Sequence, residues 1–259
     1  MKILGIDSSG LVAGVAVLQD DVILAEYNVN YKKTHSQTLL PMLDEVKRMI
    51  ELDLEAIDAI AVAAGPGSFT GLRIGSATAK GLGLALGKPL VEVPTLEGLA
   101  YNLCGVDGLV CPLIDARRNQ VYTGVYAFDG NQLRVVEPQD AVDIAHIISR
   151  INALGRERTG AKVIFLGDGV PVYRERLEQG VTVPYAFAAP GSNRQRAASV
   201  AALGALYFAE GRVVQAAEHR PEYLRKSQAE RERQEEQARQ EELSSQAESA
   251  HRTEQEENA

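Results

Sequence analysis

The feature that most constrains the fold is the segment GPGSFTGLRIG at residues 65–75. A mostly apolar run, residues 56–64, precedes it, and a helical pattern rich in small residues follows over residues 70–86. A strand that enters a helix through a glycine-rich turn is typical of α/β proteins. Two interpretations follow. The turn could present backbone N–H groups to an anion, or the small residues could let another element pack closely.

The glycine segment does not match the familiar phosphate-binding motifs. A Walker A loop requires Lys followed by Ser or Thr after its last glycine, whereas Leu-Arg follows Gly71. A dinucleotide motif would need glycine in place of Thr70, and a nucleophile elbow would need glycines two positions either side of Ser68. We leave open the interpretation that Gly67, Ser68 and Thr70 bind an anion, because helix N-termini attract negative charge.

A second candidate phosphate site is Asp7-Ser8-Ser9, at the end of the first predicted strand. An acidic residue with two hydroxyls in a hairpin can hold a magnesium–phosphate group. Alternatively, these side chains bond to backbone amides and shape the turn. Weak binding of ATP or ADP with magnesium is therefore the one cofactor left open.

The helix after the glycine segment is apolar nearly all round, which predicts that it is buried nearly all round. The same sequence pattern fits packing inside the monomer or contact with another subunit, and we expect the latter. A methionine-containing apolar stripe on the preceding helical segment, residues 34–52, supports a docking surface. The expected partner and dimer interface comprises Leu39, Leu40, Met42, Leu43, Val46, Gly71, Leu72, Gly75, Ala79, Leu82 and Gly83.

The order of predicted elements is βββαβαβ over residues 1–93. A similar but less complete pattern follows over residues 94–226: helices at 95–103, 140–151, 171–179 and 194–211, and strands at 109–115, 120–128 and 162–166. Two consecutive mixed units predict an α/β protein with two lobes. Residues 227–259 contain ten Glu, four Arg and one large apolar residue, Leu243, which predicts a disordered acidic tail.

Charge and cysteine content narrow the class of protein. The net charge is −8, of which −6 falls in the tail, so the remainder lacks the basic excess of a self-sufficient nucleic-acid binder. Two cysteines build no disulfide framework, and no apolar run reaches the length of a membrane span. We expect a cytoplasmic protein without membrane contact. No metal site is expected, because the four histidines are scattered and Leu39 stands four residues after His35.

Five segments together resemble the bacterial TsaB (YeaZ) family. They are Ile3–Ser9, His35–Pro41, Gly65–Gly75, Asp115–Arg118 and Pro221–Arg225, and the resemblance covers residues 1 to about 226. It implies the two-lobed actin-like ATPase fold (ASKHA, ribonuclease H-like) with a reduced second lobe: an N-terminal lobe at 1–93 and a C-terminal lobe at 94–226.

Membership in this family would imply a non-catalytic partner and activator of TsaD. The complex makes N6-threonylcarbamoyladenosine next to the anticodon of tRNAs that read codons beginning with A. TsaE would join the complex, tRNA would be met through the complex, and the isolated chain would form a homodimer. The docking surface would lie on the helices beginning at Ser36 and Thr70.

The resemblance also implies which chemistry is missing. TsaD-like proteins bind metal through a His-x-x-x-His pair, and this chain has His35 followed by Leu39. Asp7, Ser8 and Ser9 would then be remnants of a phosphate site. The competing class is an ATP-dependent phosphotransferase or ATPase of the same fold. A metallopeptidase is a third, weaker interpretation.

Overall fold

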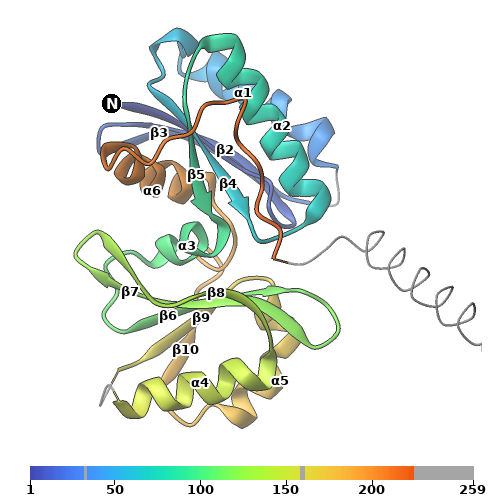
Figure 1. Ribbon diagram of the computed structural model, residues 1–259, viewed down its shortest axis with the longest axis vertical. Helices are drawn as coiled ribbons and strands as arrows, with labels where there is room; N and C mark the ends of the chain where they lie inside the picture. The colour runs from blue at the N-terminus through green and yellow to red at the C-terminus, as the bar shows by residue number, and fades with distance from the viewer. Residues whose placement is uncertain (32–33, 158–160, 225–259) are drawn as a thin grey trace, which may run out of the picture. The chain divides into compact units, whose positions relative to one another are not determined.

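In a computed structural model, residues 1–31, 34–157 and 161–224 are described. The first five strands form one sheet in the order β3-β2-β1-β4-β5 (Figure 1). The elements are β1 (Lys2–Asp7), β2 (Val12–Gln19), β3 (Val22–Asn30), α1 (His35–Met49), a 3-10 turn (Leu54–Ala56), β4 (Ala59–Gly65), α2 (Phe69–Leu86) and β5 (Leu90–Pro94). The predicted order βββαβαβ is confirmed. The acidic tail predicted at 227–259 lies outside the described residues.

Local chemistry sets the limits of these elements. Asp20 takes a positive φ of 50° in the turn between β2 and β3, a conformation that Asp tolerates better than most residues. The Ser68 hydroxyl accepts a hydrogen bond from the Gly71 N–H at 3.3 Å and so caps the start of α2. Gly87 ends that helix in the left-handed conformation at φ 62°, which glycine adopts without a Cβ penalty.

The second sheet repeats this arrangement. Its order is β10-β9-β6-β7-β8, so the hairpin strands β6, β7 and β8 correspond to β1, β2 and β3, and the parallel neighbours β9 and β10 correspond to β4 and β5. The elements are α3 (Thr95–Ala100), a 3-10 turn (Tyr101–Leu103), β6 (Leu109–Asp115), β7 (Gln120–Asp129), β8 (Gln132–Asp143), α4 (Ile144–Glu157), β9 (Val163–Leu166), α5 (Gly169–Gly180), β10 (Tyr185–Phe187) and α6 (Ala197–Ala209).

Two strands of the second sheet differ from the sequence prediction. The helix expected at 140–151 begins at Ile144, because residues 132–143 form the whole of β8 and pair with β7. β10 was also not predicted, since three residues are too short for a periodic pattern. The second unit is therefore as complete in strands as the first.

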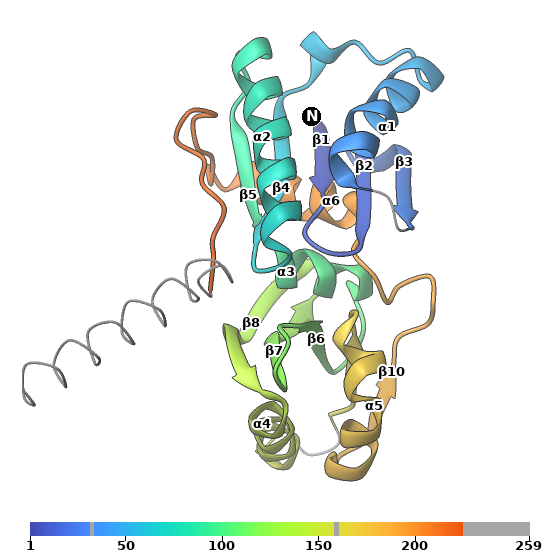
Figure 2. The same cartoon turned by 90° about the vertical axis from the view of Figure 1, so that its right-hand side faces the viewer.

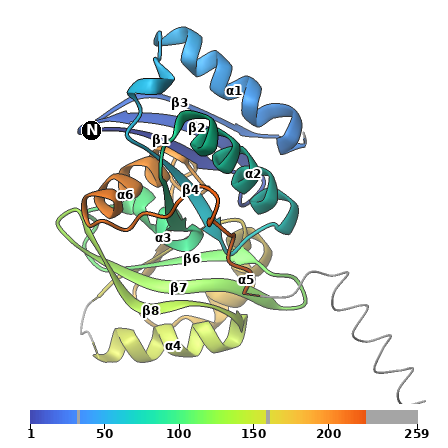
Figure 3. The ribbon, with the colours of Figure 1, turned by 45° about the horizontal axis from the view of Figure 1, so that its top comes forward.

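The last helix does not stay with the second sheet. α6 packs against the face of the first sheet opposite α1 and α2, where Val200 and Ala201 meet Ile3 and Ala61 in one apolar cluster (Figures 2 and 3). The helix is apolar along most of its length, and nine of its thirteen residues are buried. Residues 197–209 therefore cover the first sheet, although they follow the second sheet in the chain.

After α6 the chain runs along α2. We call residues 212–224 the C-terminal segment. Val214 forms a two-way backbone bridge with Leu90, and the Lys80 ammonium donates to the carbonyls of Ala217 and His219 at 3.0 and 3.1 Å. The backbone N–H of Glu222 then donates to the Ala64 carbonyl at 2.7 Å. Among the described residues, no helix combines the length and apolarity needed to cross a membrane.

Candidate functional site

The turn between β1 and β2 lies directly on the glycine segment. A Cβ added at Gly67 would lie 2.3 Å from the Ser9 carbonyl oxygen, and one at Gly71 would lie 2.1 Å from the Ser8 carbonyl oxygen. The Ser8 hydroxyl donates to the Gly71 carbonyl at 2.8 Å, and the Ser68 N–H donates to the Ser9 carbonyl at 2.7 Å. The glycines are therefore required by close packing of the chain's own turn.

This packing bears on phosphate binding. Carbonyl oxygens of Ser8 and Ser9 already face Gly71 and Gly67, and they carry the same sign of partial charge as a phosphate oxygen. In a glycine-rich phosphate site, the phosphate lies close to the glycine backbone. Here the two carbonyl oxygens, which are hydrogen-bond acceptors, already occupy that space. These residues do not fit a magnesium–nucleotide phosphate placed against the two glycines. Ser68 is exposed and caps α2, and Thr70 is exposed beside it.

Asp7 is buried inside the same turn. Its Oδ1 accepts hydrogen bonds from the Ser9 N–H at 2.9 Å and from the Ser9 hydroxyl at 2.7 Å. Burial raises the pKa of the Asp7 carboxyl above its ordinary value, and the two bonds from Ser9 act in the opposite direction. The geometry is that of an Asx turn that holds the hairpin, which is the structural alternative left open by the sequence.

His35 also serves this turn. Its Nε2 lies 2.8 Å from the Gly10 carbonyl oxygen, which fixes the start of α1 against the end of the hairpin. Within the part of the chain that the structure describes, no group of three or more His, Cys, Asp or Glu side chains is placed to hold a metal ion.

The predicted interface residues fall into two classes. Nine of the eleven are buried within the monomer: Leu39, Met42, Leu43, Val46, Gly71, Leu72, Gly75, Ala79 and Gly83. Leu82 is half-buried, and Leu40 is 54% exposed.

The four-residue glycine stripe of α2, which the sequence predicts as a contact face, is buried inside the monomer. A Cβ at Gly75 would lie 2.4 Å from the Ser8 hydroxyl, and one at Gly83 would lie 2.8 Å from the Ala216 Cβ. The N-terminal end of the stripe thus packs against the turn between β1 and β2, and its C-terminal end packs against the C-terminal segment. Because these contacts fill the stripe, its small residues serve packing inside the monomer.

A different face of α2 is open to solvent. Ala77, Gly81 and Ala85 are exposed at four-residue spacing, with Leu84 62% exposed beside them. A Cβ at Gly81 would meet nothing within 4 Å, so the monomer supplies no packing reason for this glycine. An interior helix glycine costs about 1 kcal/mol relative to alanine. In the sequence, Gly81 is recognisable because it falls outside the four-residue spacing of the other small residues on α2.

Two sheets of the same strand order, each built from an antiparallel hairpin triplet and parallel neighbours, define an α/β protein of the actin-like ATPase fold. The family model described as TsaD, tRNA N6-adenosine threonylcarbamoyltransferase, matches residues 22–233. The Bacillus subtilis tRNA threonylcarbamoyladenosine biosynthesis protein TsaB is 34% identical over 230 residues, 89% of this chain and 96% of that protein. The chain belongs to the TsaB family.

Other relatives agree with this assignment. The Escherichia coli protein TsaB is 35% identical over 144 residues, which are 55% of this chain and 62% of that protein. The solved structure of YeaZ from Pseudomonas aeruginosa matches with a TM-score of 0.72 at 28% identity, covering 86% of this chain and 99% of that one.

Proposed function

We propose that this chain is a non-catalytic, cytoplasmic partner of TsaD in the formation of N6-threonylcarbamoyladenosine next to the anticodon of tRNAs that read codons beginning with A. TsaE would join the same complex, and tRNA would be contacted through it. Family membership and the name of the Bacillus subtilis relative support this role. A single observation supports a docking function: Gly81, in the interior of α2, is exposed, and a Cβ added there would meet nothing within 4 Å.

The open face of α2 suits contact with a partner helix. Ala77, Gly81 and Ala85 lack bulk, so a second backbone can approach closely along them. Leu84 offers apolar area at the edge of this face, and Leu40 on α1 adds an exposed apolar side chain. We infer that TsaD docks on this surface, which we call the α2 face, and that the buried members of the predicted interface support it from inside.

The non-catalytic part of the proposal has its own support. The Asp7 carboxyl and both serines of the turn are engaged in bonds that shape the hairpin. Their carbonyls occupy the close approach to the glycine segment that a phosphate would require. The competing class, an ATP-dependent phosphotransferase or ATPase, would need that approach to be free.

The test is binding to TsaD measured by calorimetry with Gly81→Leu and Ala77→Leu. The expected result is an affinity at least about tenfold weaker, because a bulky side chain on a close-packed helix contact holds the backbones apart. Ala145→Leu is the matched control, since Ala145 is an exposed helical alanine on α4. Folded Gly81→Leu and Ala77→Leu proteins that bind TsaD as tightly as wild type would refute docking through the α2 face.

The alternative class is tested by calorimetry of the isolated chain with Mg-ATP. Micromolar binding that Asp7→Ala abolishes, in a variant that keeps its circular dichroism spectrum, would favour an enzyme. Absence of heat with wild-type protein is the outcome expected for a non-catalytic subunit.

A further inference from the structure

Three flat side chains are stacked where the C-terminal segment meets the first turn of α2. The centroids of the Phe69 and Tyr223 rings lie 4.8 Å apart, with 39° between the ring planes. The guanidinium carbon of Arg73 lies 4.1 Å from the centroid of the same Phe69 ring. We call Phe69, Arg73 and Tyr223 the aromatic platform. It is built from two segments that are far apart in the sequence.

The backbone beneath the platform is held by contacts that do not involve the rings. The Glu222 N–H donates to the Ala64 carbonyl, and a Cβ added at Gly65 would lie 2.2 Å from the Glu222 carbonyl oxygen. The Glu222 carboxylate accepts a hydrogen bond from the Gln139 amide at 2.9 Å. Because these contacts fix the residue before Tyr223, its ring is already in a defined position and loses little conformational freedom when a ligand binds against it.

The platform is open to solvent and lies beside unpaired positive charge. Tyr223 is 39% exposed, and Arg73 and Arg220 are exposed. Within the described ranges, no carboxylate forms an ion pair with either arginine. α2 and the C-terminal segment each contain two Arg or Lys residues, against two Glu in the segment, so together they carry a net charge of +2. The whole chain carries −8, so this surface is locally basic on an acidic protein.

This combination suits a nucleic acid with unpaired bases. In single-stranded RNA, a base can stack on an aromatic ring or on a guanidinium plane, while the neighbouring phosphates are attracted to arginine. The bases of a duplex are stacked on one another and do not offer a free face. A net charge of +2 is too small for strong binding on its own, so the platform fits an RNA that a larger surface already holds.

We propose that the aromatic platform stacks against an unpaired base of tRNA in the complex of this chain with TsaD. The proposal rests on the proposed function, because the platform continues the α2 face toward the start of the helix. Arg73, Ala77 and Gly81 are exposed at four-residue spacing, so they lie on one side of α2. A TsaD molecule docked on the α2 face has the platform at the edge of the contact. This chain then binds tRNA directly and does not act through TsaD alone.

The experiment is binding of end-labelled tRNA to the complex of the full chain with TsaD, followed by fluorescence anisotropy at several salt concentrations. Tyr223→Leu is expected to weaken tRNA binding about fivefold or more, the usual effect of losing one base–aromatic stack. Tyr223→Phe keeps the ring and should bind tRNA as wild type does. Arg73→Met should weaken binding and reduce the slope of log K against log salt by about 0.7, the value for one phosphate contact on a single strand.

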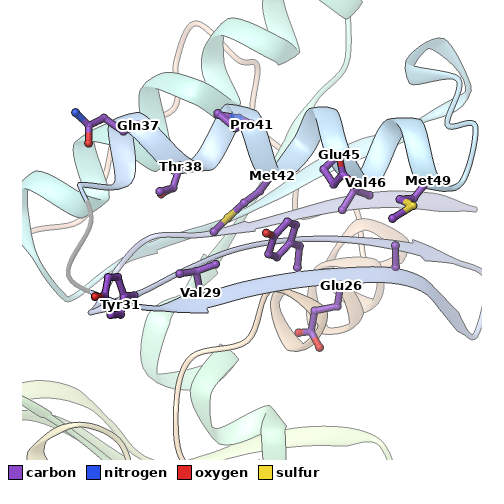
Figure 4. A pocket seen from close by; sticks show the side chains of 12 residues that line it. Glu26, Val29, Tyr31, Gln37, Thr38, Pro41, Met42, Glu45, Val46 and Met49 are labelled. Carbon is purple, nitrogen blue, oxygen red and sulfur yellow. The ribbon is translucent and has the colours of Figure 1, made fainter.

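Tyr27→Leu is the matched control. Tyr27 is 41% exposed and lines a groove of about 840 Å³ between β3 and α1 (Figure 4). β3 is one edge of the first sheet, whereas the C-terminal segment pairs with β5 at the other edge. Tyr27→Leu should therefore leave the affinity for tRNA unchanged.

Binding of each variant to TsaD is measured separately by calorimetry, and Tyr223→Leu should equal wild type. Folded Tyr223→Leu protein whose complex binds tRNA as tightly as wild type would overturn the proposal. So would a variant that loses tRNA and TsaD binding in the same proportion, because the platform would then be a protein contact. If Tyr223→Leu weakens tRNA binding while Gly81→Leu leaves TsaD binding intact, the platform stands and docking through the α2 face fails.

Discussion

The Ser8 hydroxyl occupies the position that a side chain at Gly75 would need, because a Cβ there would lie 2.4 Å from the Ser8 oxygen. The same hydroxyl is held by its bond to the Gly71 carbonyl and cannot easily give way. The hairpin turn at Ser8, which lies 63 residues before Gly71 in the chain, thus explains the glycines at the N-terminal end of α2.

Gly75→Ala is expected to lower the free energy of unfolding by about 1–3 kcal/mol, the usual cost of forcing a methyl group into a filled space. Gly81→Ala is the matched variant on the same helix. It should raise the free energy of unfolding by about 0.5–1 kcal/mol, because open space surrounds that position and alanine favours helix. Urea unfolding followed by circular dichroism measures both. Equal effects of the two substitutions would contradict the packing described here.

Asp7→Asn is expected to leave the protein as stable as wild type, or more stable, at pH 7. Burial raises the pKa of this carboxyl, so the folded state favours the protonated form, and ionisation above the ordinary value of 3.8 weakens folding as pH rises. Asparagine keeps an oxygen that can accept from Ser9 and carries no charge. The gap between variant and wild type should therefore shrink as pH is lowered toward 4 in chemical denaturation experiments. A less stable Asp7→Asn protein at pH 7 would show that the ionised carboxylate has a stabilising partner.

The two cysteines should differ sharply in reactivity. Burial raises the pKa of the Cys111 thiol to about 12, and the side chain is fully inaccessible. Cys104 is partly exposed. A thiol reagent at pH 8 is expected to label one cysteine per folded chain rapidly and the second only after unfolding. Cys104→Ser should remove the fast phase, and a fast phase that survives this substitution would contradict the assignment.

Lys80→Met should loosen the C-terminal segment. The substitution keeps most of the apolar stem and removes the ammonium that donates to Ala217 and His219. Because Lys80 is partly exposed, the loss of stability should be modest, about 1 kcal/mol. Amide hydrogen exchange at residues 214–219 is expected to accelerate. Lys88→Met, which removes a bond to the Glu55 carbonyl elsewhere, is the control and should leave exchange in the segment unchanged.

The first sheet could be predicted from the sequence because its elements have clear periods and clear stops. The Asp20-Asp21 turn, the cap at Ser68 and the stop at Gly87 all occur where local chemistry places them. β8 was missed, since its alternation merges with the apolar pattern of α4. The destination of α6 could not be read from the sequence, because a helix apolar on all sides carries no information on which sheet it covers.

The interface residues that the sequence predicts on α2 lie mostly inside the monomer, and another face of the same helix is open to solvent. A helix that is apolar nearly all round offers two faces of small residues, and periodicity alone does not distinguish them. The decisive facts are the contacts of Ser8 with Gly75 and of Ala216 with Gly83, which join distant parts of the sequence. Gly81 could have indicated the open face from the sequence, since it is the interior glycine of α2 that does not follow the spacing of the others.

The return of α6 to the first sheet has a consequence for biosynthesis. Ile3, Ala61 and Val93 belong to a sheet face that gains its cover when residues 197–209 arrive. A nascent chain must therefore carry that apolar face uncovered while the whole second sheet is translated. Chains released before α6 should be clients of chaperones and proteases, whereas chains lacking residues after 224 already contain both sheets and α6.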